Sequence, residues 1–385
     1  MSRPDILIAV GGIITIAALV YFTPLKPAGE FPVDVGNFTC VNNDYSCAAE
    51  FFRDITKSAS SAKAIDTLIE LKGAGRILPS VDDHQLAHEI GRQAAETFGV
   101  SSEAFLSCPM SAFNGGCQHG YFEYVLLRAK TATEAADAIC KGLGDKYSDK
   151  FRFYCYHGVG HGVMMAVAYD LARGLEICDT LDPDWAGEGC WQGLFMENVN
   201  AGMRGEARDG IFSASDPLQP CESLPDKYQH QCYDNHAGYL MVYFKNDFSE
   251  AVAACLKAKL PRDKSTCLQS IGNMATNPIW QINFLGEAMG ESAAERGWEL
   301  CSMFPESYRG DCVIGGTNNI MNFHELQPAA AEEFCRLMDS RNAGLCYRTI
   351  GLNIRHQTVD EKIIRGLCAE FSIKYEKNCL DGAGL

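Results

Sequence analysis

Cysteine spacing constrains this 385-residue chain more than any other feature. The 18 cysteines form nine successive pairs, and from residue 140 onward the two members of each pair are 11 to 15 residues apart. An even count with regular local spacing is typical of a disulfide framework, which persists only in an oxidising compartment. The predicted pairs are Cys40 with Cys47, Cys108 with Cys117, Cys140 with Cys155, Cys178 with Cys190, Cys221 with Cys232, Cys255 with Cys267, Cys301 with Cys312, Cys335 with Cys346, and Cys368 with Cys379.

Metal ligation by these cysteines is the competing interpretation. Zinc ribbons and c-type haem attachment both use C-x-x-C knuckles, and the sequence contains none. We therefore expect disulfides, and a domain that lies in the periplasm or at a cell surface.

The amino terminus predicts a membrane anchor. Residues 6–22 are 17 uncharged and almost wholly apolar residues, which is near the lower limit for a transmembrane helix. No small-residue cleavage pattern follows them, so retention is favoured over removal. We expect a transmembrane anchor over residues 1–23 and a proline-rich linker over residues 24–36, with the carboxyl-terminal bulk outside the cytosol.

Charge excludes one class of partner. The chain carries 33 basic and 49 acidic residues, a net charge of −16, which opposes binding to nucleic-acid phosphates.

A glycine-rich polar loop near residues 200–220 suggests a division into a histidine-bearing helical domain (37–212) and a set of disulfide-stapled helical repeats (213–385).

The cysteine pairs mark a helical repeat. The second cysteines recur every 33 to 45 residues from Cys117 onward, which is the length of a helix–turn–helix unit. Three residues after each of them stands a small or short side chain, usually glycine, as close helix packing requires. These residues are Gly120, Gly158, Gly193, Asn235, Ser270, Gly315, Thr349 and Gly382. The predicted fold is all-α: αα-hairpin repeats in a solenoid, with about one disulfide per repeat, after a single N-terminal transmembrane helix.

In architecture the chain resembles the cysteine-rich Sel1-like repeat proteins, which are secreted αα-repeat proteins with one disulfide per repeat. The segments that carry the resemblance are Ala251–Cys255 (AVAAC) and Cys267–Gly272 (CLQSIG). The resemblance implies a binding or interaction scaffold. The glycine-rich turn typical of that family is absent here, so no functional residue is carried over.

Histidine spacing points to a site. Five of the nine histidines lie between residues 84 and 161, and the pairs His84 with His88 and His157 with His161 are each four residues apart. His119 and Glu123 repeat this spacing. On a helix, residues at i and i+4 share one face, which is the geometry for holding one metal ion with two side chains.

The helix around the first pair has clear boundaries. Ser80 or Asp82 is suited to cap its start and Gly99 its end. Glu89 lies about a hundred degrees round this helix from His88, on a face expected to be solvated.

Repeat register brings the three motifs together. Counted from the second cysteine, the second and sixth positions are His119 and Glu123 in one unit and His157 and His161 in the next. Equivalent positions in neighbouring repeats lie side by side. With the preceding helix included, the predicted metal ligands are His84, His88, His119, Glu123, His157 and His161.

An imidazole-rich ligand set with one carboxylate suits a transition metal, with zinc as first choice and copper or iron as alternatives. Zinc with an open position would permit hydrolysis, with Glu123 or Glu89 as the candidate catalytic base. A dinuclear copper or iron site would support redox chemistry instead.

Two other functions are consistent with the sequence. One is a non-catalytic repeat scaffold that binds a protein or peptide on its concave face. The other is bis-histidine haem binding between the first and last pairs. The scaffold predicts that the five rings scatter into separate core contacts, whereas the metal site predicts that they converge.

Overall fold

The described part of the chain is all-helical. The computed structural model describes residues 38–40, 44–77, 81–109, 112–141, 143, 149–181, 186–205, 207–277, 281, 292–324 and 326–385, and every regular element within these ranges is a helix. The predicted anchor and linker lie outside the described residues. Within the described ranges, the helices all fall short of the length and apolarity needed to cross a membrane.

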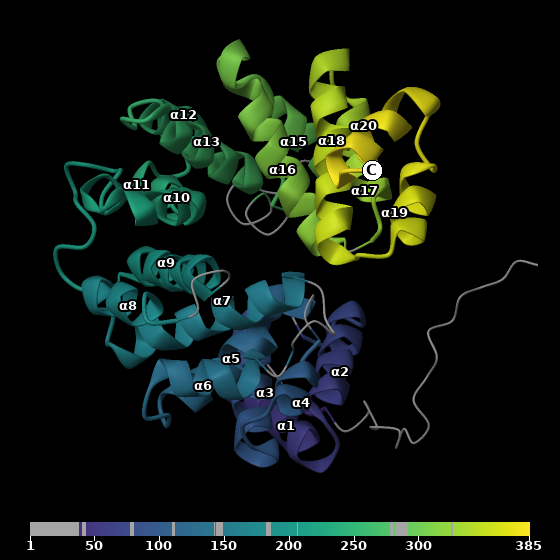
Figure 1. Ribbon diagram of the computed structural model, residues 1–385. Helices are drawn as coiled ribbons and strands as arrows, with labels where there is room; N and C mark the ends of the chain where they lie inside the picture. The colour runs from purple at the N-terminus through teal and green to yellow at the C-terminus, as the bar shows by residue number, and fades with distance from the viewer. Residues whose placement is uncertain are drawn as a thin grey trace, which may run out of the picture.

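The helices follow one another along a curved row (Figure 1). The first half comprises α1 (Tyr45–Ser58), α2 (Ser61–Gly73), α3 (Asp83–Phe98), α4 (Ser102–Leu106), α5 (Gly116–Leu126), α6 (Ala132–Ile139), α7 (Asp149–Ala166), α8 (Leu171–Cys178) and α9 (Ala186–Arg204). These run from the purple end of the row to its teal middle.

The second half continues the row and curves back towards the first. It comprises α10 (Asp226–Asn235), α11 (Ala237–Tyr243), α12 (Phe248–Cys255), α13 (Pro261–Ala275), α15 (Ala293–Ser302), α16 (Arg309–Phe323), α17 (Ala329–Arg336), α18 (Ser340–Gln357), α19 (Glu361–Cys368) and α20 (Ile373–Ala383). Helix α18 also contacts α7, so residues far apart in the sequence meet.

All nine predicted disulfides are confirmed. The paired Cα atoms lie 5.4 to 5.7 Å apart, which is the usual span of a disulfide. So many disulfides indicate an oxidising, extracytoplasmic environment, as the sequence predicts. The bonds join Cys40 to Cys47, Cys108 to Cys117, Cys140 to Cys155, Cys178 to Cys190, Cys221 to Cys232, Cys255 to Cys267, Cys301 to Cys312, Cys335 to Cys346, and Cys368 to Cys379.

Most of these disulfides join a short helix to the longer helix that follows it. Cys178 at the end of α8 is joined in this way to Cys190 in α9. At the carboxyl-terminal end of the row, Cys335 in α17 is joined to Cys346 in α18. Each such bond fixes where the longer helix lies against the short helix before it.

Four helix pairs cross at facing glycines, and we call these contacts glycine crossings. A methyl group added to the first glycine would overlap the carbonyl oxygen of a cysteine in the second helix. A methyl group added to the second glycine would overlap the carbonyl oxygen three residues before the first. The crossings are Gly91 with Gly120 (α3 and α5), Gly160 with Gly193 (α7 and α9), Gly272 with Gly315 (α13 and α16), and Gly351 with Gly382 (α18 and α20). The cysteines that supply the carbonyl oxygens are, in the same order, Cys117, Cys190, Cys312 and Cys379.

The predicted small-residue position therefore has a physical reason at four places. Gly120, Gly193, Gly315 and Gly382 occupy it, and at each the neighbouring backbone fills the space of a Cβ. Gly158 occupies the same position but faces the Phe122 ring instead. Only glycine allows two helix backbones to approach this closely.

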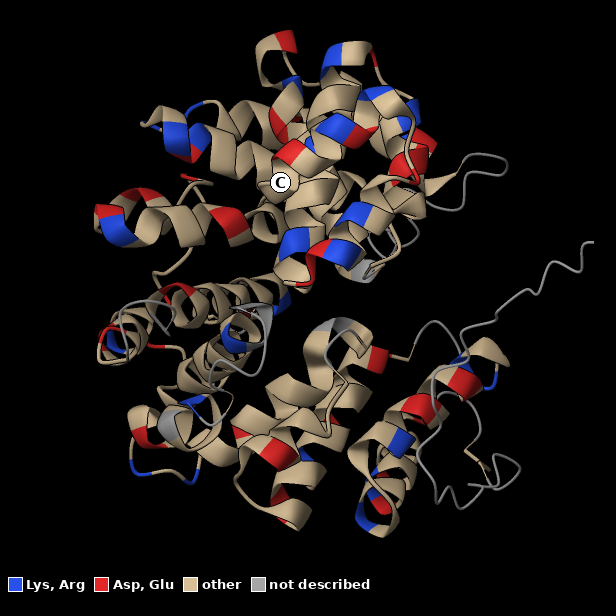
Figure 2. Ribbon diagram, turned by 45° about the vertical axis from the view of Figure 1, so that its right-hand side comes forward, with Lys and Arg blue, Asp and Glu red and all other residues tan. Residues whose placement is uncertain are grey.

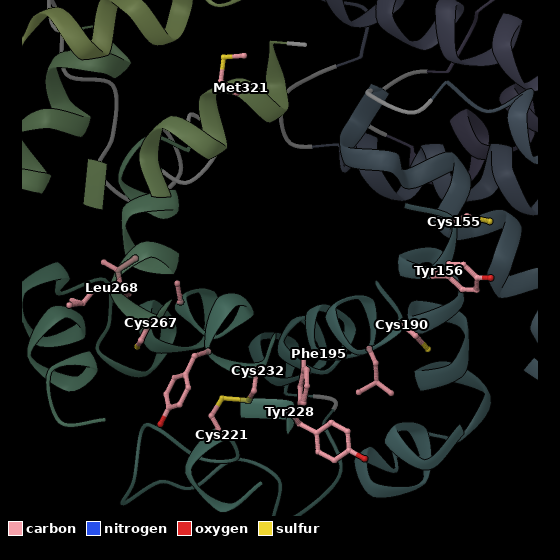
Figure 3. Close-up of a cluster of buried hydrophobic side chains, with 14 of the residues drawn as sticks. Cys155, Tyr156, Cys190, Phe195, Cys221, Tyr228, Cys232, Cys267, Leu268 and Met321 are labelled. Carbon is pink, nitrogen blue, oxygen red and sulfur yellow. A yellow bond between two sulfur atoms is a disulfide. The ribbon is translucent and has the colours of Figure 1, made fainter. Parts of the chain in front are cut away.

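The buried apolar side chains are spread along the row rather than gathered at one centre. One cluster extends from Ala94 to Ala383 and a smaller one from Phe38 to Cys117. Figure 3 shows members of the larger cluster following the curve of the helices from Cys155 to Met321. This cluster extends on both sides of residue 213, and the domain boundary expected there stays a prediction.

Charged residues of both signs are interspersed over the helices rather than separated into two faces (Figure 2). Two of the three helices that carry the clustered histidines, α5 and α7, have few charged residues. Helix α7 has no charged residue after Arg152, and Glu123 is the only charged residue of α5.

The glycine crossings yield a stability prediction. Gly315→Ala should lower the free energy of unfolding by about 1–3 kcal/mol, because the added methyl group overlaps the backbone of α13. Gly366→Ala in α19 is the matched control, since a Cβ there meets nothing within 4 Å. It should raise stability by about 0.5–1 kcal/mol through helix propensity. Guanidinium unfolding with the disulfides intact measures both, and equal midpoints would contradict the role assigned to the crossings.

Candidate metal centre

Three helices bring five histidine rings together. His84 and His88 lie on α3, His119 on α5, and His157 and His161 on α7. The centroids of neighbouring rings are 4.1 to 5.5 Å apart. The rings therefore form one cluster instead of scattering into separate contacts.

Local structure explains this convergence. Asp82 caps the start of α3 by accepting a hydrogen bond from the Gln85 amide (3.0 Å), and Gly99, with a φ of 81°, ends it. Both boundaries were predicted. The glycine crossings then hold α3 against α5 and α7 against α9, with His88 and His157 each three residues before a crossing glycine. The histidines lie where the backbones approach most closely.

Four of the five rings are buried. The exposed fraction is 3% for His88, 4% for His119 and His157, and 1% for His161, whereas His84 is partly exposed. The site thus has a closed side at α7 and a side nearer to solvent at the start of α3.

The Nδ1 atom of each paired histidine is hydrogen-bonded to an oxygen. His88 contacts Glu123 Oε1 (2.6 Å) and His161 contacts Glu197 Oε2 (3.1 Å). His84 contacts the Phe113 carbonyl oxygen (2.6 Å). His157 contacts Gln192 Oε1 (3.2 Å), and the amide nitrogen of Gln192 donates to Asp234 (2.7 Å).

These contacts fix the tautomers. A carbonyl oxygen or a carboxylate accepts hydrogen bonds, so Nδ1 carries the hydrogen in all four rings. In the neutral imidazole Nε2 then has a free lone pair. The Nε2 atoms of His84 and His88 are 2.9 Å apart, and those of His157 and His161 are 3.1 Å apart. Two facing lone pairs at this distance repel each other unless a cation, either a proton or a metal ion, lies with them.

Burial disfavours a positive charge on several of these rings. Desolvation, together with the neighbouring His88, lowers the pKa of His84 to about 4. Desolvation and His161 lower the pKa of His157 to about 3. The pKa of the fully enclosed His119 lies well below its usual value for the same reasons. These three imidazoles are therefore neutral at pH 7.

Both carboxylates that the sequence predicts, Glu89 and Glu123, form ion pairs with arginine. Arg92 contacts Glu123 and also Glu89 (2.7 Å), and Arg53 contacts Glu89 (3.0 Å). Burial alone would raise the pKa of Glu123, but hydrogen bonding to His88 and the charge of Arg92 lower it to about 2. Glu89 was expected on a solvated face, and it forms this partly buried ion-pair network instead.

A second carboxylate was not predicted. Glu197 on α9 is 6% exposed, and besides His161 it contacts the Tyr169 hydroxyl (3.0 Å) and Arg204 (3.4 Å). Hydrogen bonding to His161 lowers its pKa although burial opposes this. The available signal was that Glu197 is the only charged residue between Glu188 and Arg204. It stands one residue beyond the position that the repeat register singles out, which Met196 occupies.

The donor atoms fall into two groups of metal-ligand spacing. His84, His88 and His119 form one group, and His119, His157 and His161 form the other, with all donors in a group within 4.8 Å of one another. Glu123 belongs to neither group and contacts the outer nitrogen of His88. Cys221, Cys232 and His236 have similar spacing, but the two sulfurs form a disulfide and offer no thiolate.

Comparison with known proteins gave no match to any protein-family model, curated protein or solved structure. The resemblance to Sel1-like proteins stays a prediction at the level of the family. The coarser part of it agrees with the structure, since the described chain is helical and repeats disulfide-linked helix pairs.

The lowered histidine pKa values predict acid sensitivity of the metal-free protein. In the unfolded chain these histidine side chains bind protons near pH 6.5, whereas in the folded protein His84 binds its proton near pH 4 and His157 near pH 3. The contribution of these two rings to the free energy of unfolding is therefore complete above pH 6.5. It falls below that pH, by about 2–3 kcal/mol per ring at pH 4.5. Guanidinium unfolding of chelator-treated protein between pH 7.5 and 4.5 measures this loss.

His157→Asn should flatten that pH dependence, because one buried titrating group is removed. His324→Asn, at an exposed position, should leave it unchanged. A slope that His157→Asn does not alter would contradict the prediction.

Proposed function

We propose that this chain is an extracytoplasmic metal-binding protein whose centre is built from His84, His88, His119, His157 and His161. The observation that carries the proposal is the pairing of Nε2 lone pairs at 2.9 and 3.1 Å, with every Nδ1 of the two pairs bonded to an oxygen. Histidine ligands of metals are held in this way by outer carboxylates and carbonyls. The fold we propose for the whole chain is an αα-solenoid anchored by residues 6–22.

A metal ion explains the arrangement better than a proton does. A proton shared by two imidazoles satisfies two nitrogens and needs no third donor. Here a third ring, His119, lies within ligand distance of both pairs. Two nitrogens bound at 2.0–2.1 Å to one ion, at an angle between 90° and the tetrahedral value, are about 3 Å apart, which matches both pairs.

Zinc is our first choice of metal, with copper and iron as alternatives. The inner donors are all imidazole nitrogens, which suit these three ions and not magnesium or calcium. Glu123 and Glu197 strengthen the donors, because a carboxylate on Nδ1 raises the basicity of the imidazole. Both remain ionised near neutrality, so each offsets part of the charge of an ion held by buried rings.

The proposed chemistry is metal-dependent hydrolysis or redox catalysis. A zinc ion with an open position supplies a water of lowered pKa, and copper or iron supplies electron transfer. In this proposal Glu123 orients His88, Glu197 orients His161, and Arg92 fixes Glu123 against Glu89. Because hydrogen bonds from arginine occupy their oxygens and lower their basicity, we assign Glu89 and Glu123 orienting roles rather than the role of catalytic base.

The test is metal content. The full chain, purified under oxidising conditions without chelator or affinity histidines, should carry at least one equivalent of a transition metal by elemental analysis. The double variant His84→Ala/His157→Ala should lose it, because each ligand group then lacks one of its three rings. The matched control is His324→Ala/His356→Ala, which removes two exposed histidines and should retain the metal.

Circular dichroism verifies that each variant keeps its helical fold. Wild-type protein that is purified without metal and also takes up no zinc, copper or iron would contradict the proposal. Stoichiometric metal retained by His84→Ala/His157→Ala would contradict the site assignment.

A further inference from the structure

We infer that the centre holds two metal ions and that the His119 ring ligates both. This inference rests on the proposed metal-binding function and adds the number of ions and the role of one residue. The observation behind it is that five rings supply two separate ligand groups that share His119 alone.

One ion cannot use all five rings as they lie. Donors bound at 2.0–2.1 Å are at most about 4.2 Å from one another. The His84/His88 pair and the His157/His161 pair are not members of a common group, even at a spacing of 4.8 Å. Each pair is instead complete with His119 as its third ligand, as three-ligand zinc sites require.

His119 lies between the two pairs. Its ring centroid is 5.5 Å from those of His84 and His88, and 5.5 and 4.1 Å from those of His157 and His161. No other ring of the cluster is close to both pairs in this way. His119 also comes from α5, the helix between α3 and α7.

His119 differs from the other four rings in its outer nitrogen. Its Nδ1 is buried and has no hydrogen-bond partner, whereas Nδ1 of each paired histidine contacts an oxygen. A buried nitrogen left without a hydrogen-bond partner destabilises the folded protein. A second metal ion at this nitrogen removes this destabilisation, and the ring then binds one ion through each nitrogen, with its ring proton released to solvent.

The two ions would differ in accessibility. The His84 group includes the partly exposed ring, whereas all three rings of the other group are buried. We therefore assign the His84 side as the position that exchanges its ion with solvent and admits a small external ligand. The His157/His161 ion is enclosed.

Zinc titration followed by removal of unbound ion tests the number of ions. Wild-type full chain should bind two equivalents. His84→Gln/His88→Gln and His157→Gln/His161→Gln should each bind one, and the control His324→Gln/His356→Gln should bind two. A limited dose of chelator should remove one equivalent from wild type, which is the ion on the His84 side. The same dose should leave no zinc in His157→Gln/His161→Gln, because that variant lacks the enclosed ion.

Copper(II) loading of wild-type protein tests the shared ring without any mutation. Two copper ions joined by one imidazole couple magnetically, so the electron paramagnetic resonance signal should account for much less than the total copper. Two equivalents with a full, uncoupled signal would overturn the shared role of His119. One equivalent in wild type would overturn the two-ion inference and leave the proposed function standing, whereas no bound metal would defeat the proposed function itself.

Discussion

Close approach of paired helix backbones is the constraint on which the rest of this structure depends. At each of the four glycine crossings the two helices leave no room for a Cβ atom. This approach places His88 directly against α5 and His157 directly against α9. Glu123 of α5 then reaches the outer nitrogen of His88, and Glu197 of α9 reaches that of His161. The disulfides add to this constraint by fixing where each longer helix begins relative to the short helix before it.

The same kind of glycine crossing occurs in both halves of the row, but the side chains beside it differ. The residue three positions before the first glycine is His88 or His157 in the first half and Gln269 or Arg348 in the second. Packing is thus maintained by the glycines and cysteines, while the residues between them are free to vary. A site can be built on such a repeat without changing the fold that supports it.

The features that the sequence predicts well are local ones. Cysteines 7 to 15 residues apart pair with their neighbours because a short loop separates them, so all nine disulfides follow from spacing. The His84/His88 and His157/His161 pairs follow from the period of a helix, and Asp82 and Gly99 from capping chemistry. Each of these depends on residues within one or two helical turns, or within one helix–turn–helix unit.

The features that sequence reasoning missed depend on how helices cross. Glu197 is 36 residues from His161, and only the angle between α7 and α9 decides that it, rather than Met196, reaches that ring. The Phe113 carbonyl cannot be read from a side-chain pattern at all. Arg92 and Glu89 share a helix face that looks solvated in sequence, but α1 covers it with Arg53.

The central claim is that the clustered imidazoles, and no other donors of this chain, hold a transition metal. X-ray absorption of the zinc-loaded full chain tests it most directly. We predict three or four nitrogen neighbours at about 2.0–2.1 Å with the multiple scattering of imidazole rings. A first shell of oxygen without imidazole scattering, or sulfur at about 2.3 Å, would contradict the account.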